Sequence, residues 1–142
     1  MHRDVQLVVN SYIENLDESG LAEGDAEISR TSHAAKMSVR GSDIFLCYEE
    51  QSEGGKIFSD IRLCSDGITV SRRGAIESVL LFKDGEEFNT VYSVPPYKFD
   101  MHVKTLRIRS SADENGGEVD ILYTMTIGGA CKKCRMRLAI SV

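Results

Sequence analysis

The chain has 142 residues and a net charge of −5, and 42% of its residues are hydrophobic and 27% charged. These values are ordinary for one soluble globular domain, here spanning residues 1–142, and they exclude a low-complexity chain. The acidic balance disfavours a nucleic-acid partner, because the phosphate backbone attracts basic surfaces.

The N-terminus leads directly into an alternating stretch and has no apolar core of signal-peptide length. No apolar run approaches the length of a membrane span. We therefore expect a cytoplasmic protein without a membrane partner, in which the 4 cysteines stay as thiols.

Apolar residues alternate with polar ones along most of the chain, which predicts β-strands with one buried face. The first strand covers 5–13, and an acidic loop follows over 15–25. Residues 26–33 predict only a weak strand, at an edge or a barrel mouth, because Ile28 is their one large apolar residue. The alternation resumes at Met37.

The later strands are separated by Asp-Gly, Gly-Gly and Pro-Pro breaks, which are typical of antiparallel hairpins. A slip in the alternation near Lys104 and Thr105, with Leu106 and Ile108 as the next apolar pair, predicts a β-bulge. Helical periodicity is absent, so the pattern predicts an all-β, antiparallel barrel of about ten strands. The remaining strands are expected over 37–39, 44–50, 57–63, 68–73, 76–82, 88–94, 97–108, 119–127 and 135–142.

Cys131 and Cys134 form the one motif with the spacing of a metal or redox site. A zinc site commonly needs a second pair, and Cys47 and Cys64 are isolated. If both cysteines lie in a strand, an offset of three residues points them to opposite faces. We expect ordinary packing, with no metal and no cofactor.

The basic residues Lys132, Lys133, Arg135 and Arg137 favour a solvated strand face over a functional patch. The histidines are scattered, and His102 falls on the polar phase of its strand. Neither a nucleophile elbow nor a phosphate-binding glycine loop is present, so we name no catalytic residue.

Polar residues in phase with apolar ones give the candidate site. Arg72 shares a face with Ile68 and Val70, and Tyr48 and Tyr92 continue the apolar faces of their own strands. We expect Arg72 or Arg73 to lie with both tyrosines near one end of the barrel interior. Arg73 remains a second candidate, because a bulge at Gly74 would point Arg73 instead of Arg72 into the barrel.

A buried arginine needs an anionic partner. One alternative is a ligand carboxylate bound in two-point geometry. The other is an internal carboxylate, or an arginine that reaches solvent at the rim. The internal candidates are Glu49, Glu50 and Glu77. A ligand would place its apolar part against Leu46, Ile61, Leu80, Phe99 and Ile121.

Five short motifs follow one another along the chain. They are Tyr48-Glu49-Glu50, Arg72-Arg73-Gly74, Phe82 with its Asp-Gly turn, Tyr92 followed by Pro95, and Asn115-Gly116-Gly117 before the strand at Val119. In their order and spacing the chain resembles the YwiB-like family, bacterial proteins of unknown function with a lipocalin-like, calycin-type β-barrel. The resemblance extends over nearly the whole chain, implies the barrel fold and supplies no activity.

Three functions remain open. The first is a non-catalytic binding protein for a small, partly apolar ligand, carboxylate ligands included, held inside the barrel. The second is an interaction module whose barrel is filled by its own side chains. The third is an enzyme with an unrecognised site. A homodimer is compatible with all three.

Overall fold

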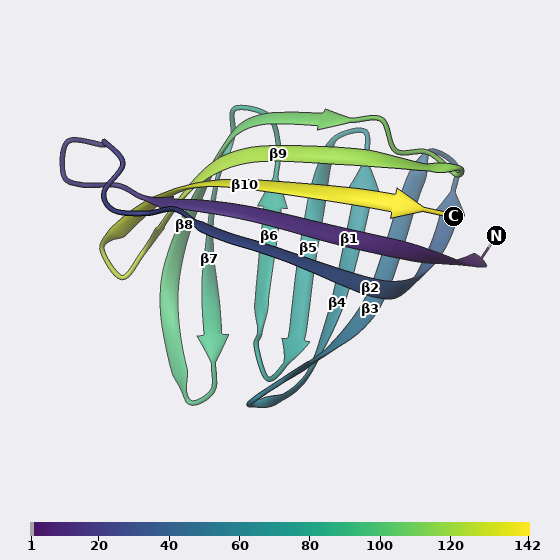
Figure 1. Ribbon diagram of the computed structural model, residues 1–142, viewed down its shortest axis with the longest axis horizontal. Coiled ribbons are helices and arrows are strands. Elements are labelled where there is room, and N and C mark those ends of the chain that lie inside the picture. The colour runs from purple at the N-terminus through teal and green to yellow at the C-terminus, as the bar shows by residue number, and fades with distance from the viewer. Residues whose placement is uncertain (1) are drawn as a thin grey trace.

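The computed structural model describes residues 2–142, which form ten strands and no helix. None of these residues therefore belongs to a helix that could cross a bilayer. Each strand is shown in Figure 1. The strands are β1 (His2–Asn15), β2 (Glu27–Arg40), β3 (Asp43–Ser52), β4 (Gly55–Cys64), β5 (Gly67–Gly74), β6 (Ser78–Phe82), β7 (Glu87–Val94), β8 (Tyr97–Ser110), β9 (Gly116–Ile127) and β10 (Ala130–Ser141).

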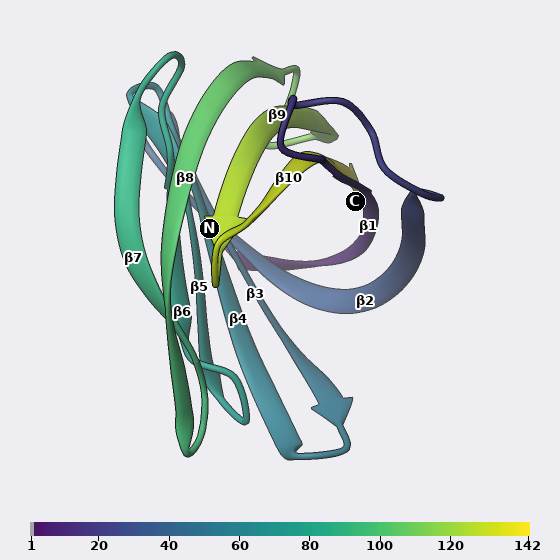
Figure 2. The same ribbon diagram turned by 90° about the vertical axis from the view of Figure 1, so that its left-hand side faces the viewer.

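All ten strands form one antiparallel sheet in the order β6-β5-β4-β3-β2-β1-β10-β9-β8-β7. The sheet curls into a nearly closed barrel, so that β6 and β7 lie side by side (Figures 1 and 2). Two backbone hydrogen bonds between Glu77 and Ser93, both 2.8 Å long, join this seam. The all-β antiparallel barrel expected from the alternation is confirmed.

Two local predictions concern strand bounds and a bulge. Residues 27–33 do not form a separate weak strand, because they belong to the long strand β2, which continues through Met37. The bulge in β8 is present, as a register shift between Thr105 and Arg107. The extra residue is Leu106, which is exposed, and Thr105 takes the buried position instead. The bulge predicted near Lys104 and Thr105 is therefore confirmed.

One half of the barrel is filled by large apolar side chains from every part of the sheet; we call it the packed end. It contains the turns that join β2 to β3 and β4 to β5. Full burial of one such side chain contributes about 1.5–3 kcal/mol, so this half supplies much of the stability. Its most completely buried apolar residues are Leu7, Met37, Leu46, Phe82, Val103, Val119, Ile121 and Leu138.

The other half, the open end, contains the 16–26 loop and the hairpins β3–β4, β7–β8 and β9–β10. Here β2 separates from β3: the last register pair is Lys36 with Cys47, although both strands continue. Figure 2 shows β2 curving away from the β3–β4 hairpin. This divergence widens the barrel at the open end and leaves room inside it.

Candidate functional site

A cavity of about 510 Å³ lies inside the open end. This volume falls within the range of small-molecule sites. Every strand except β4 contributes to the lining. The lining residues are Val9, Ser11, Ile13, Ser29, Thr31, His33, Tyr48, Glu50, Val70, Arg72, Ser78, Leu80, Tyr92, Met101, Tyr123, Met125, Ile127, Lys132 and Met136.

Arg72 is the central charged group of one wall. It lies in register with Ser59 on β4 and with Ser78 on β6, and both serines are buried. Its guanidinium nitrogen is 3.9 Å from Glu50 Oε1, which is longer than a hydrogen bond. The Arg72 side chain is 35% exposed to solvent. The pair is therefore loose and accessible from the cavity, and Glu50 is the internal carboxylate that the sequence left open.

Tyr48 and His33 close the gap where β2 leaves β3. Their rings stack with centroids 4.3 Å apart, and His33 Nε2 lies 2.9 Å from Thr31 Oγ1. Burial raises the pKa of the Tyr48 hydroxyl, and the positive charge of Arg72 opposes that rise. The hydroxyl therefore stays protonated near neutral pH and can donate a hydrogen bond to an oxygen atom beside Arg72.

The opposite wall, from β8, β9, β10 and β1, is mostly apolar. Met101, Met125 and Met136 line it, and unbranched methionines adapt to ligands of irregular shape. Tyr123 closes the cavity toward the packed end, where its ring lies 4.8 Å from that of Phe82. Burial raises the pKa of Tyr123. The cavity thus has a polar wall, from β2 to β6, facing an apolar wall.

Of the four predicted site residues, Arg72, Tyr48 and Tyr92 meet around this cavity. Arg73 does not. It lies on the outer wall, where its side chain is 71% exposed and 3.8 Å from Asp60. Its guanidinium lies over the Phe58 ring at 5.6 Å. Of the two arginines, Arg72 is therefore the one that faces the barrel interior. The register between β4 and β5 is regular up to Gly74, so no bulge there exchanges the two positions.

The residues predicted to contact the apolar part of a ligand lie in three different parts of the barrel. Leu80 lines the cavity, but Leu46, Ile61 and Ile121 are buried in the packed end. Phe99 is exposed on the β7–β8 hairpin. The alternation of a strand indicates which face a residue occupies, whereas its depth along the barrel depends on how the strands are staggered.

Several lining residues escaped the sequence reasoning, above all Ser29, Thr31 and His33 of β2. Their signal is a period-two row of polar residues in phase with Ala35 and Met37, which are buried. Such a row indicates a strand whose inward face turns from apolar to polar along its length. Lys132 was counted among the surface basic residues, but it lines the cavity.

Cys134 is buried and Cys131 is half-buried, three positions apart on β10. A strand rises about 3.3 Å per residue, which separates them by roughly 10 Å, beyond the reach of a disulfide. Burial raises the pKa of the Cys134 thiol to about 11. Within residues 2–142, no three His, Cys, Asp or Glu side chains are placed to hold a metal ion.

The rest of the basic cluster faces outward. Arg135 makes two hydrogen bonds to Asp120, of 3.0 and 2.7 Å, across the β9–β10 pair. These bonds hold the pKa of Asp120 below its usual value. This pairing agrees with a balanced strand face rather than a basic binding patch.

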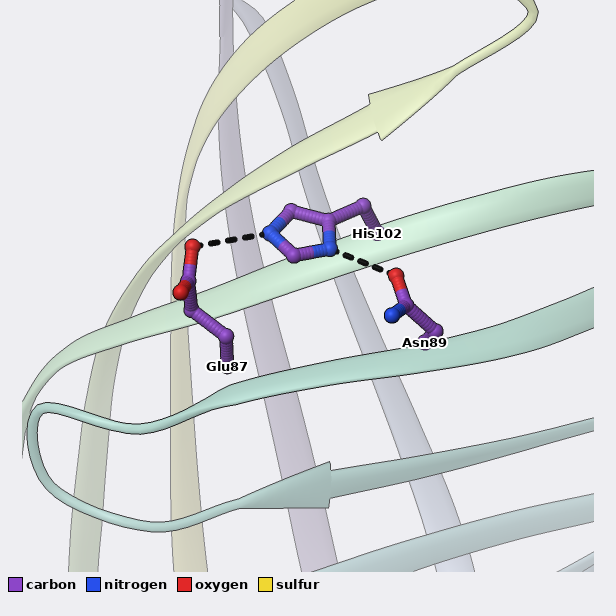
Figure 3. Close-up of polar contacts among 3 residues, drawn as sticks. All are labelled: Glu87, Asn89 and His102. Atoms are coloured by element: carbon purple, nitrogen blue, oxygen red, sulfur yellow. Dashed lines mark hydrogen bonds and ion pairs between the residues drawn. The ribbon is translucent and has the colours of Figure 1, made fainter.

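His102 lies on the outer wall of the β7–β8 hairpin, as its polar phase predicted. Figure 3 shows its ring between two residues of β7, with Nδ1 2.6 Å from Asn89 Oδ1 and Nε2 3.0 Å from Glu87 Oε1. The three side chains tie neighbouring strands together on the surface, and none of them lines the cavity. This cluster is therefore separate from the candidate site.

Residues 17–140 match the domain of unknown function DUF1934. The chain belongs to this family. It is 24% identical over 124 residues to the uncharacterized β-barrel protein YwiB of Bacillus subtilis (strain 168), covering 87% of this chain and 82% of that protein. The crystal structure of B. subtilis YwiB superimposes with a TM-score of 0.81 and 22% identity, covering 99% of this chain and 94% of that one. The resemblance to YwiB-like proteins is confirmed, and this DUF1934 domain shares the YwiB fold.

Proposed function

We propose that this protein is a non-catalytic binding protein, whose barrel cavity takes a small, partly apolar ligand with a carboxylate end. The observation that carries the proposal is the opposition of Arg72 on one wall to a methionine-rich wall within one cavity. An amphipathic ligand would satisfy both walls. A wholly polar ligand would leave the apolar wall without contacts, and a wholly apolar ligand would leave the guanidinium without an anion.

The charges of the lining favour an anion. The lining carries two cations, Arg72 and Lys132, and one carboxylate, Glu50. Arg72 has five N–H donors in a fork that matches a carboxylate, and its contact with Glu50 is too long to satisfy them. The Tyr48 hydroxyl adds a neutral donor close to the same position.

The space in the open end favours a binding protein over an interaction module with a filled barrel. A filled barrel needs side chains that interdigitate to native density, as they do at the packed end. At the open end the inward positions include serine, threonine and unbranched methionine, and a cavity of about 510 Å³ remains between them and the larger lining residues. No arrangement of the described side chains provides a matching argument for an enzyme.

Native mass spectrometry of freshly purified protein would show a co-purifying ligand and would also report whether the protein is a homodimer. Titration calorimetry with small carboxylates would then be run on the wild type and on Arg72→Met. Losing one charged hydrogen-bonding group costs about 1.5–3 kcal/mol, so we expect binding to weaken by about 10- to 150-fold. Arg73→Met is the matched control, because that arginine lies on the outer wall and should leave affinity unchanged.

Equal affinity in the wild type and Arg72→Met would contradict the proposed site. A variant whose unfolding midpoint shifts while no carboxylate binds to either protein would assign Arg72 to an internal pair with Glu50.

A further inference from the structure

The tip of the β7–β8 hairpin carries an apolar surface that continues the cavity. Tyr92 pairs with Phe99 and Val94 with Tyr97, so these four residues share one face of the hairpin. That face is the one on which Tyr92 and Met101 line the cavity. We call Val94, Tyr97 and Phe99 the hairpin lip.

The hairpin lip is open to solvent. Tyr97 is 67% exposed and Phe99 43%. The cause is the stagger of the sheet: the last pair of β8 with β9 is Met101 with Ile127, so β8 extends beyond its neighbour on that side. Figure 2 shows this hairpin standing at the edge of the barrel.

The sequence of this segment is nevertheless that of a half-buried strand. Tyr97, Phe99 and Met101 alternate with Lys98 and Asp100, which lie on the outer face. A hairpin tip with both faces in water would not need apolar residues on one face and polar residues on the other. The apolar face therefore fits a strand that is covered, at least part of the time, on its cavity side.

We propose that the hairpin lip binds the apolar chain of an elongated, single-chain carboxylate whose charged end lies at Arg72. This inference rests on the proposed function and specifies the class of ligand. Arg72 is two residues from the end of β5, so the charged end would lie close to the mouth. A chain crossing to the methionine wall would leave the cavity beside Met101 and follow β8 toward Tyr97, a path of about 13 Å.

The test is a series of straight-chain carboxylates, from hexanoate through octanoate and decanoate to dodecanoate, titrated by calorimetry. Each further buried methylene should tighten binding to the wild type by up to about fourfold. In the double variant Tyr97→Ser/Phe99→Ser, hexanoate should bind as it does to the wild type, and the gain with chain length should stop at the shorter members of the series.

The matched control is Val91→Ser. Val91 is 46% exposed on the same hairpin but opposite Asp100, on the outer face. It should keep the wild-type dependence on chain length. An unchanged dependence in the double variant, or the same loss in Val91→Ser, would overturn the inference and leave the proposed function standing.

Two further outcomes are decisive. If no member of the series binds, the proposed function and this inference both fail. If sedimentation shows a wild-type dimer that the double variant loses, the lip is an interface with a second copy of the chain and not a ligand surface.

Discussion

Strand β10 passes through both halves of the barrel, and its inward residues differ between them. At the packed end they are Leu138 and Ile140, which are buried in contact with other large apolar side chains. Toward the open end they are Met136, Cys134 and Lys132, of which Met136 and Lys132 line the cavity. The same strand thus contributes to a packed core at one end and to the wall of a cavity at the other. The change results from the size and polarity of successive inward side chains, without a break in the sheet.

The inward face of β2 also changes from buried residues to polar residues that line the cavity, but here the pairing of the strand changes as well. Met37 and Ala35 are buried, and then His33, Thr31 and Ser29 follow on the same face. Here the strand also leaves its neighbour, because pairing with β3 ends at Lys36. The hollow therefore has two causes: small or unbranched side chains at several inward positions, and one strand that bends away. Filling it would require changes in several strands together.

The largest effect on stability is expected from truncating inward residues of β10, one in each half of the barrel. Leu138→Ala leaves a void in a packed region and should lower the free energy of unfolding by about 3 kcal/mol. Met136→Ala enlarges a space that already exists, so we expect a loss of about 1 kcal/mol or less. Urea denaturation of both variants measures the difference.

In carboxylate titrations, the same two variants should show the opposite order of effects on binding affinity. Met136→Ala should weaken binding, whereas Leu138→Ala should not, provided that it is measured well below its unfolding midpoint. Equal destabilisation by the two truncations would mean that the open end is packed as tightly as the other.

The fold was readable from the sequence because each strand obeys a strict alternation and each break has a turn signal. The phase also placed Arg72 and both tyrosines inside the barrel. It could not separate Leu46 from Tyr48, which share a face of β3, although only Tyr48 lines the cavity. That distinction depends on the stagger of ten strands, which no single stretch encodes. Phe99 shows the same limit, since its exposure results from the end of β9 and not from its own neighbours.

A second prediction concerns Cys134, the inward residue of β10 between Met136 and Lys132. Cys134 is buried and its pKa is raised to about 11, so its thiolate is scarce at pH values near 8. Cys47 is exposed. With iodoacetamide, peptide mapping should show Cys47 alkylated at least about a hundredfold faster than Cys134, a ratio that corresponds to roughly 2.7 kcal/mol.

Adding urea beyond the unfolding midpoint is the control, because it should make all four cysteines react alike. Comparable rates for Cys47 and Cys134 in the native protein would place Cys134 in open contact with solvent. The cavity would then include Cys134, which pairs with Tyr123 across β9 and β10.

A third and smaller effect is expected on the outer wall. Asp120 accepts two hydrogen bonds from Arg135, and its pKa is lowered in the folded protein. Asp120→Asn should therefore cost about 0.5–1 kcal/mol near neutral pH, the usual range for a partly exposed ion pair. Chemical denaturation over a pH series measures this difference.

The pH dependence follows from the lowered pKa. The contribution of Asp120 is complete above its ordinary pKa of 3.8 and disappears as the pH falls through the lower folded value. The wild type and Asp120→Asn should therefore converge in stability under acid conditions. A difference that persists unchanged in acid would show that packing, and not the ionised carboxylate, is responsible. Carboxylate binding should be the same in both proteins, because Asp120 is outside the cavity.

The smallest effect belongs to His102, although its cluster is the most conspicuous polar arrangement on the surface (Figure 3). The side chains of His102 and Glu87 are 41% and 60% exposed, so water competes for both. A cross-strand polar pair of this kind contributes about 0.2–1 kcal/mol. We expect His102→Ala to lower the free energy of unfolding by about 0.5 kcal/mol and to leave carboxylate affinity unchanged. Met101→Ala, the adjacent inward residue, should weaken binding instead. If His102→Ala weakened binding as much as Met101→Ala, the ligand would have to lie on the outer face of the hairpin, and the division into a binding interior and a structural exterior would be wrong.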